Sequence, residues 1–245
     1  MMKKFRGFTL IELLVVISVI ALLLAIMIPV MRKAREAARE VVCRSNLRGI
    51  GIGIQAFLQD KDDRFPDFSM ANGFFWYDSN HDLRSIDQWD TYWGVAFKKY
   101  VTDPKIFGCP SFLKVAELIY PIDPSLIKEG SYGLNSNTNG KKSSSIRYPR
   151  NFIIAHDHVE PRMEQGSTDM FFNDGPGTKN LQQYREGGAR ARFYRGIFRH
   201  AVRRFEPFRT DGRANSLWLD GHVESIAETT GDNIPKWWYT GENPY

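Results

Sequence analysis

The chain opens with an uninterrupted apolar run. It reads FTLIELLVVISVIALLLAIMIPV over residues 8–30 and contains a single charged side chain, Glu12. A helix needs about 20 apolar residues to cross the hydrocarbon of a bilayer, so the run predicts a membrane span. Pro29 removes one backbone hydrogen bond near the end of this run and is expected to bend the helix where it leaves the membrane.

A second pattern continues the helix beyond the apolar run. Over residues 31–59, apolar residues return every three or four positions and are separated by Arg, Lys, Glu and Gln, which predicts an amphipathic helix. Gly49, Gly51 and Gly53 each cost about 1 kcal/mol relative to Ala in a helix. The helix is therefore expected to fray, bend or pack closely against another element at these glycines.

The second half of the chain has the pattern of a β-rich head. Residues 151–159 and 216–226 are typical of strands, and the second segment contains Asp220-Gly221, which favours a type I′ hairpin. Pro, Gly, Asn and Ser dominate the stretches between them, which predicts loops. The predicted fold class is α+β, with a long N-terminal helix, transmembrane and then amphipathic, packed on a head formed by residues 60–245.

The charges indicate how the chain crosses the membrane. Lys3, Lys4 and Arg6 precede the apolar run, which predicts a cytoplasmic N-terminus and a head on the outer side of a single-pass protein. These three residues supply much of the formal net charge of +5, so no nucleic-acid partner is expected. The arginines that gather between residues 185 and 213 are expected to be solvated or paired with acids.

Glu12 needs a partner inside the membrane. A charged side chain deep in hydrocarbon costs about 2.5–3.5 kcal/mol on insertion scales. Cleavage after Gly7 would create a new amine at Phe8, which can neutralise the carboxylate within one helix or between adjacent subunits. A secretory signal peptide would have a shorter apolar core and a small-residue cleavage site. A plain signal anchor leaves Glu12 unexplained.

The N-terminal residues resemble the type IV pilin and type II secretion pseudopilin superfamily. The match consists of a basic leader, residues 1–7, followed by Phe8-Thr9-Leu10-Ile11-Glu12 and the apolar run. The resemblance implies that a prepilin peptidase cleaves between Gly7 and Phe8 and methylates the Phe8 amine, and that Glu12 and Pro29 serve assembly. It implies a structural subunit, a pseudopilin or minor pilin, in a secretion pseudopilus or a surface pilus. Its partners would be other pilin subunits and the assembly platform of a bacterial inner membrane, with the head in the periplasm or on the filament.

Motifs in the rest of the chain resemble a bacterial group of pilin-like proteins that carry a C-terminal processing-associated motif, H-x9-DG. These motifs are Cys43, Asn46-Leu47, Asp62-Asp63, Phe65-Pro66, Phe107-Gly108-Cys109-Pro110-Ser111, Ser131-Tyr132-Gly133-Leu134-Asn135 and Asp220-Gly221-His222. His200 would be the histidine of H-x9-DG. Nineteen residues separate it from Asp220, however, where the motif has nine.

The chain has 2 cysteines, Cys43 and Cys109, and both follow the apolar run. In an oxidising compartment they can form a disulfide, and the alternative is two buried free thiols. The resemblance to the H-x9-DG group favours the disulfide.

One group of residues offers weak candidates for a metal site: His156, His158, Asp220 and His222. Two of the histidines project from one face of a predicted strand, and imidazole with carboxylate suits a divalent ion. Their spacing is not compact, so ordinary strand and turn residues are the simpler interpretation and no cofactor is expected. The resemblance to pseudopilins suggests calcium if a metal binds.

The sequence contains no nucleophile elbow, phosphate loop or recognisable Cys-His pair, so no enzymatic activity is expected. Aromatic residues crowd residues 74–93 and 237–239, where they either fill the core or form a ligand surface. The alternative functions are therefore a membrane-anchored sugar- or protein-binding head and, less favoured, a metal-dependent hydrolase. Trp76 and Trp93 would carry ligand binding in the first of these.

Overall fold

The computed structural model describes residues 8–67, 73–101, 103–112, 128–158, 196–203, 210–229 and 234–242. The basic leader with Gly7, residue 159 and most of the arginine-rich stretch lie outside the described residues. The chain divides into two compact units, Met1–Ala38 and Arg39–Tyr245. The second unit, called the head below, therefore includes the last part of the N-terminal helix.

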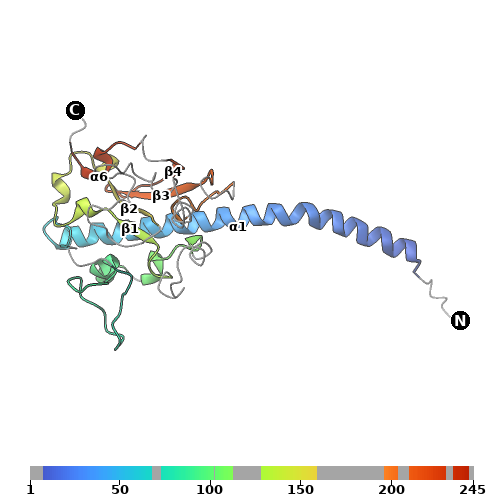
Figure 1. Cartoon of the computed structure of the whole chain (residues 1–245), viewed down its shortest axis with the longest axis horizontal. Coiled ribbons are helices and arrows are strands. Elements are labelled where there is room, and N and C mark those ends of the chain that lie inside the picture. Colours follow the sequence, from blue (N-terminus) through green and yellow to red (C-terminus); the bar gives the residue numbers. More distant parts are fainter. Residues whose placement is uncertain are drawn as a thin grey trace, which may run out of the picture. The chain divides into compact units, whose positions relative to one another are not determined.

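A single helix, α1 (Leu10–Asp60), covers both predicted helical segments and contains Pro29 (Figure 1). The predicted long helix is confirmed and begins two residues later than Phe8. All side chains from residue 8 to residue 35 are exposed. By length and composition this apolar helix can cross a membrane, and it fits the single-pass anchor that is typical of pilins. The bend expected at Pro29 stays a prediction.

The last five turns of α1 form one wall of the core of the head. The buried residues recur at helical spacing and are Cys43, Leu47, Ile50, Gly51, Gly53, Ile54, Phe57 and Leu58. A Cβ atom on Gly51 would lie 2.9 Å from Leu217 Cδ1, and one on Gly53 would lie 2.6 Å from Val101 Cγ2. The glycines therefore permit close packing, one of the three outcomes expected, while the helix continues through them.

Four antiparallel strands form the sheet of the head, in the order β1 (Tyr132–Leu134), β2 (Ile153–Asp157), β3 (Arg213–Trp218) and β4 (Val223–Ala227). Figure 1 shows this sheet beside the C-terminal part of α1. The inner strands β2 and β3 are almost completely buried, and their register shifts between Ile153 and Ala155, a β-bulge. The β-rich head and the α+β class are confirmed.

The β3–β4 hairpin is confirmed, but its predicted turn type is wrong. Gly221 has a φ of +90°, whereas Asp220 keeps a negative φ. A type I′ turn requires positive φ at both central residues. Trp218 N donates to the carbonyl of His222 at 3.0 Å, so the loop has three residues with glycine in the left-handed position. A positive φ strains a residue that carries a Cβ atom, such as Asp220, whereas Gly221 adopts it without strain.

Aromatic side chains form a further part of the core of the head. Trp93, on the 3-10 helix η1 (Trp93–Tyr100), packs edge to face on Phe107, with ring centroids 5.2 Å apart. Trp76 contacts the same ring at 5.0 Å and is 4% exposed. These tryptophans are core residues, so a ligand surface built on Trp76 and Trp93 is wrong. Among the aromatic residues between positions 74 and 93, Phe75, Tyr77 and Trp89 are exposed.

Candidate functional site

A capping box closes the N-terminal end of α1. The Thr9 amide donates to Glu12 Oε2 at 2.9 Å, and the Glu12 amide donates to Thr9 Oγ1 at 3.3 Å. The Thr9 hydroxyl also donates to Glu12 Oε2, at 2.7 Å. Two backbone donors at the start of the helix are thereby satisfied. Glu12 thus has a partner in its own chain, in addition to the amine expected from cleavage after Gly7.

The cleavage site itself is only half described. Phe8 precedes the capping box and is 69% exposed. Gly7 lies outside the described residues, and the leader cleavage stays a prediction. The spacing of Thr9 and Glu12 in the sequence is that of a capping box, T-x-x-E, and this signal was available without a structure.

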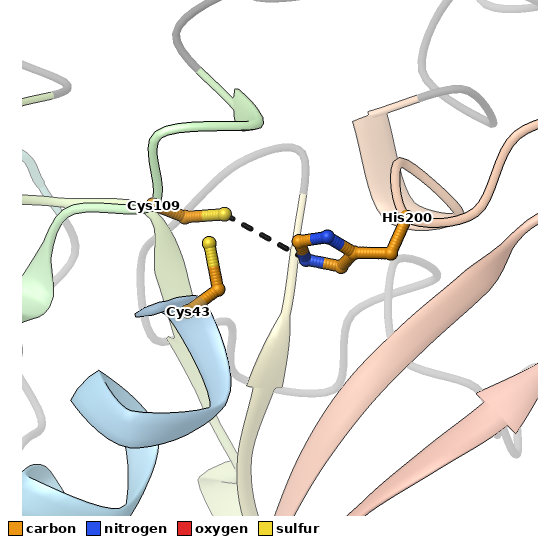
Figure 2. A group of neighbouring side chains, drawn as sticks. All are labelled: Cys43, Cys109 and His200. Carbon is orange, nitrogen blue, oxygen red and sulfur yellow. Dashed lines mark hydrogen bonds between the residues drawn. The ribbon is translucent and has the colours of Figure 1, made fainter. Parts of the chain in front are cut away.

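A second group of reactive side chains is buried inside the head. Cys43 on α1, Cys109 after the 3-10 helix η2 (Pro104–Phe107) and His200 before β3 point toward one another in Figure 2. Their sulfur and ring nitrogen atoms all lie within 4.8 Å of one another. Cys109 Sγ is 3.7 Å from His200 Nε2, and all three residues are 0% exposed. Three distant parts of the chain therefore bring two thiols and one imidazole together away from solvent.

Asp157, the last residue of β2, holds the ring of His200. Its Oδ2 lies 3.0 Å from His200 Nε2 and accepts a hydrogen bond from the Asn215 amide at 2.7 Å. Arg199 binds the other carboxylate oxygen, and both side chains of this ion pair are 0% exposed. The guanidinium also donates to three carbonyls, those of His158, Gly196 and Ser131. A buried ion pair with this many hydrogen bonds offsets much of its desolvation penalty.

The arginines between residues 185 and 213 were expected to be solvated or paired with acids, and for Arg199 the pairing with an acid is confirmed. The pair lies in the interior, however, because the segment that carries Arg199 and His200 joins the sheet. His200 forms two backbone hydrogen bonds with Arg213 at the start of β3, at 3.1 and 2.8 Å. The charge of Arg199 is therefore balanced by Asp157 inside the head.

The charges of this cluster shift the pKa values of its members. Burial lowers the pKa of His200, but the charge of Asp157 and the hydrogen bond to it prevail and raise this pKa to about 10. Burial raises the pKa of the Cys109 thiol, yet the hydrogen bond with Cys43, the charge of Arg199 and the contact with His200 bring it well below its usual range. The pKa of the Cys43 thiol is raised by its hydrogen bond with Cys109 and by burial. The cluster therefore favours imidazolium beside thiolate.

The two cysteines are free thiols in the structure. Their proximity agrees with the pairing expected from the resemblance, but the bond is not formed, and the disulfide stays a prediction. Two buried free thiols, the alternative, describe the structure as it stands.

The weak metal candidates are not brought together. Among the residues that the structure describes, the metal-competent group is Cys43, Cys109 and His200. His156 and His158 are buried and pack edge to face at 5.2 Å, and burial lowers the pKa of His156 to about 3. They lie on β2 and just after it. Asp220 and His222 instead belong to the β3–β4 turn.

The DG end of the processing-associated motif is a structural turn. Asp220 Oδ1 accepts from the His222 amide at 3.1 Å and lies 2.5 Å from His222 Nδ1. The His222 ring stacks on Trp218, with centroids 5.4 Å apart. His200 lies at the opposite end of β3, because the extra residues precede the strand. The processing-associated motif therefore does not form one compact site.

Two family models match this chain. One is described as a prokaryotic N-terminal methylation motif and matches residues 2–28. The other is described as a protein of unknown function (DUF1559) and matches residues 32–180, more than half of the chain. The chain belongs to this family. No curated protein and no solved structure matches it.

The two matches identify a pilin-like protein and indicate processing by a prepilin peptidase. The methylation motif covers Phe8, Thr9 and Glu12, the residues around the capping box. The DUF1559 match covers Cys43, Cys109 and Asp157 and ends before Arg199 and His200. The sequence interpretation found the cleavage motif with Phe8 and Glu12 but missed the capping box and the buried cluster, whose members meet only after the sheet has formed.

Proposed function

We propose that this chain is a structural subunit, a pseudopilin or minor pilin, that assembles through α1 into a type II secretion or type IV pilus-like filament. The observation that carries the proposal is the methylation motif over residues 2–28, which coincides with a helix whose side chains are exposed from residue 8 to residue 35. Exposed apolar surface of this extent needs lipid or other helices to cover it. A membrane supplies the first cover and neighbouring subunits the second.

The proposed role is assembly and requires no catalysis by the chain. The basic leader keeps the N-terminus cytoplasmic, and the head lies in the periplasm or on the filament. After cleavage, the Phe8 amine of one subunit neutralises Glu12 of its neighbour, which lowers the cost of transferring each helix from the bilayer into the bundle. Partners are the prepilin peptidase, other pilin subunits and the assembly platform.

Processing is tested by intact mass and N-terminal sequencing of the protein from its native membrane. We expect the wild-type chain to start at a methylated Phe8 and the Gly7→Ala variant to keep Met1. A wild-type chain that starts at Met1 would leave a signal-anchored head and overturn the proposal.

Assembly is tested separately at Glu12, because the capping box offers a matched pair of variants. Glu12→Gln keeps an acceptor at the third helical position, so the cap survives while the charge is lost. Glu12→Ala loses both the cap and the charge. We expect both variants to be cleaved, to insert and to fail to enter filaments, as measured by shearing and pelleting. If Glu12→Gln assembles normally while Glu12→Ala does not, the carboxylate serves the cap alone.

A further inference from the structure

We propose that Cys43, Cys109 and His200 bind a thiophilic divalent metal ion, for which zinc is the best match. The proposal concerns the interior of the head and is independent of the filament role. It rests on the arrangement in Figure 2, in which two sulfur atoms and one ring nitrogen converge from three separate segments. The ion would cross-link three segments: α1 through Cys43, the loop after η2 through Cys109, and the segment before β3 through His200.

The distances suit a tetrahedral ion. Zinc lies about 2.3 Å from a thiolate sulfur and about 2.0–2.1 Å from an imidazole nitrogen, so a tetrahedral site has sulfur–nitrogen edges of about 3.6 Å and sulfur–sulfur edges of about 3.8 Å. The Cys109 Sγ to His200 Nε2 distance is 3.7 Å, and every pair of ligand atoms lies within 4.8 Å. Small side-chain rotations are therefore enough to close the site.

Asp157 lies beside the three ligands but outside the group whose ligand atoms all lie within 4.8 Å of one another. Its Oδ2 is 3.0 Å from His200 Nε2 and carries the negative charge nearest to this ligand. Its other oxygen is held by Arg199. A divalent ion with two thiolates, one carboxylate, a neutral imidazole and the guanidinium of Arg199 is electrically neutral. No net charge is therefore buried at the site.

The ligand types select the ion. Thiolates and imidazole suit zinc, whereas calcium takes oxygen ligands. All three ligands are 0% exposed, so a substrate cannot reach the ion, as in structural zinc sites. A disulfide would need a sulfur–sulfur distance of about 2.05 Å and would leave His200 and Asp157 without a role in it. The metal and the disulfide exclude each other, because each requires both sulfurs.

The decisive measurement is made on the full-length wild-type chain, purified in detergent from its native membrane. Zinc is counted by mass spectrometry of the element, and thiols are titrated after denaturation with a chelator. We expect one zinc ion and two titratable thiols per chain. An intact mass lower by two hydrogens with no titratable thiol would show the disulfide and overturn the proposal. Two thiols without zinc, also after incubation with zinc chloride and gel filtration, would overturn it as well.

Variants then assign the ligands. Cys109→Ser and His200→Ala are expected to lose the zinc, whereas His81→Asn, at an exposed turn with a φ of +66°, keeps it as the matched histidine control. Because the ligand variants risk misfolding, cobalt is exchanged into the wild-type chain. Tetrahedral cobalt–thiolate absorption bands support the proposal. Octahedral cobalt without a thiolate charge-transfer band, or equal zinc in the ligand variants, refutes it.

Discussion

The glycines at the end of α1 give a prediction whose sign depends on what each Cβ meets. Replacing Gly by Ala in a helix gains about 1 kcal/mol. At Gly53 the new Cβ would lie 2.6 Å from Val101 Cγ2 and 3.4 Å from the Tyr100 carbonyl oxygen. Val101 is stiff and buried, and overpacking of this kind costs about 1–3 kcal/mol. At Gly49 the Cβ would meet only Ile106 Cδ1, at 3.3 Å, the mobile end of a half-buried side chain.

We therefore expect Gly53→Ala to lower the free energy of unfolding by about 1 kcal/mol and Gly49→Ala to leave it unchanged or raise it by up to about 1 kcal/mol. The difference corresponds to about 2–4 °C in midpoint temperature per kcal/mol for a head of this size. The assay is unfolding of the full-length chain in detergent, followed by tryptophan fluorescence. All 6 tryptophans lie beyond α1, so the signal reports on the head. Equal shifts for both variants would refute the packing argument.

Two further variants test the polar contacts of the head by the same unfolding assay. Arg199→Met removes the guanidinium that pairs with the buried Asp157 carboxylate and leaves only His200 and the Asn215 amide beside it, so we expect a loss of about 3–5 kcal/mol, partly restored in the double variant with Asp157→Asn. A loss below about 1 kcal/mol would contradict this. The Ser143 hydroxyl and the Ser144 amide donate to Asp63, and these bonds hold the pKa of Asp63 below its usual range. The stabilisation is complete above the unfolded pKa of about 3.9 and is lost as the pH falls through the lower folded value. Asp63→Asn should therefore cost about 1 kcal/mol at neutral pH and nothing in strong acid, whereas a constant difference would show that charge is irrelevant.

Local patterns were sufficient for α1 and for the strands β2, β3 and β4. The apolar run and the three-to-four residue spacing that follows it predicted α1 to within two residues at either end, and the strand-like residues around Asp220-Gly221 predicted the β3–β4 hairpin. The turn type was wrong because Asp-Gly occurs both in two-residue turns and in longer loops, and only the pairing of Trp218 with His222 separates them. Strand β1 has three residues, too few to show a period, and it exists because it pairs with β2.

The buried cluster shows where local patterns stop being informative. Asp157 and Arg199 are separated by more than forty residues, and nothing in their immediate sequence indicates that they form an ion pair. The proximity of Cys43 and Cys109 was expected from their place beyond the apolar run and, more strongly, from a family resemblance. Their contact with His200 depends on α1, η2 and the sheet packing together, which is tertiary information. The capping box, by contrast, follows from the spacing of Thr9 and Glu12, although the sequence analysis assigned Glu12 only to the Phe8 amine.

The two ends of α1 can therefore be studied as separate problems. The core of the head, as far as the structure describes it, begins at Cys43. Phe8, Thr9 and Glu12 lie in the other compact unit, more than thirty residues before Cys43 in the sequence. Effects of substitutions at independent sites usually add. A Glu12 variant that fails to assemble should thus unfold at the wild-type midpoint, and a destabilised head should still be cleaved after Gly7. Any change in head stability caused by Glu12→Gln would show that the helix couples the two units.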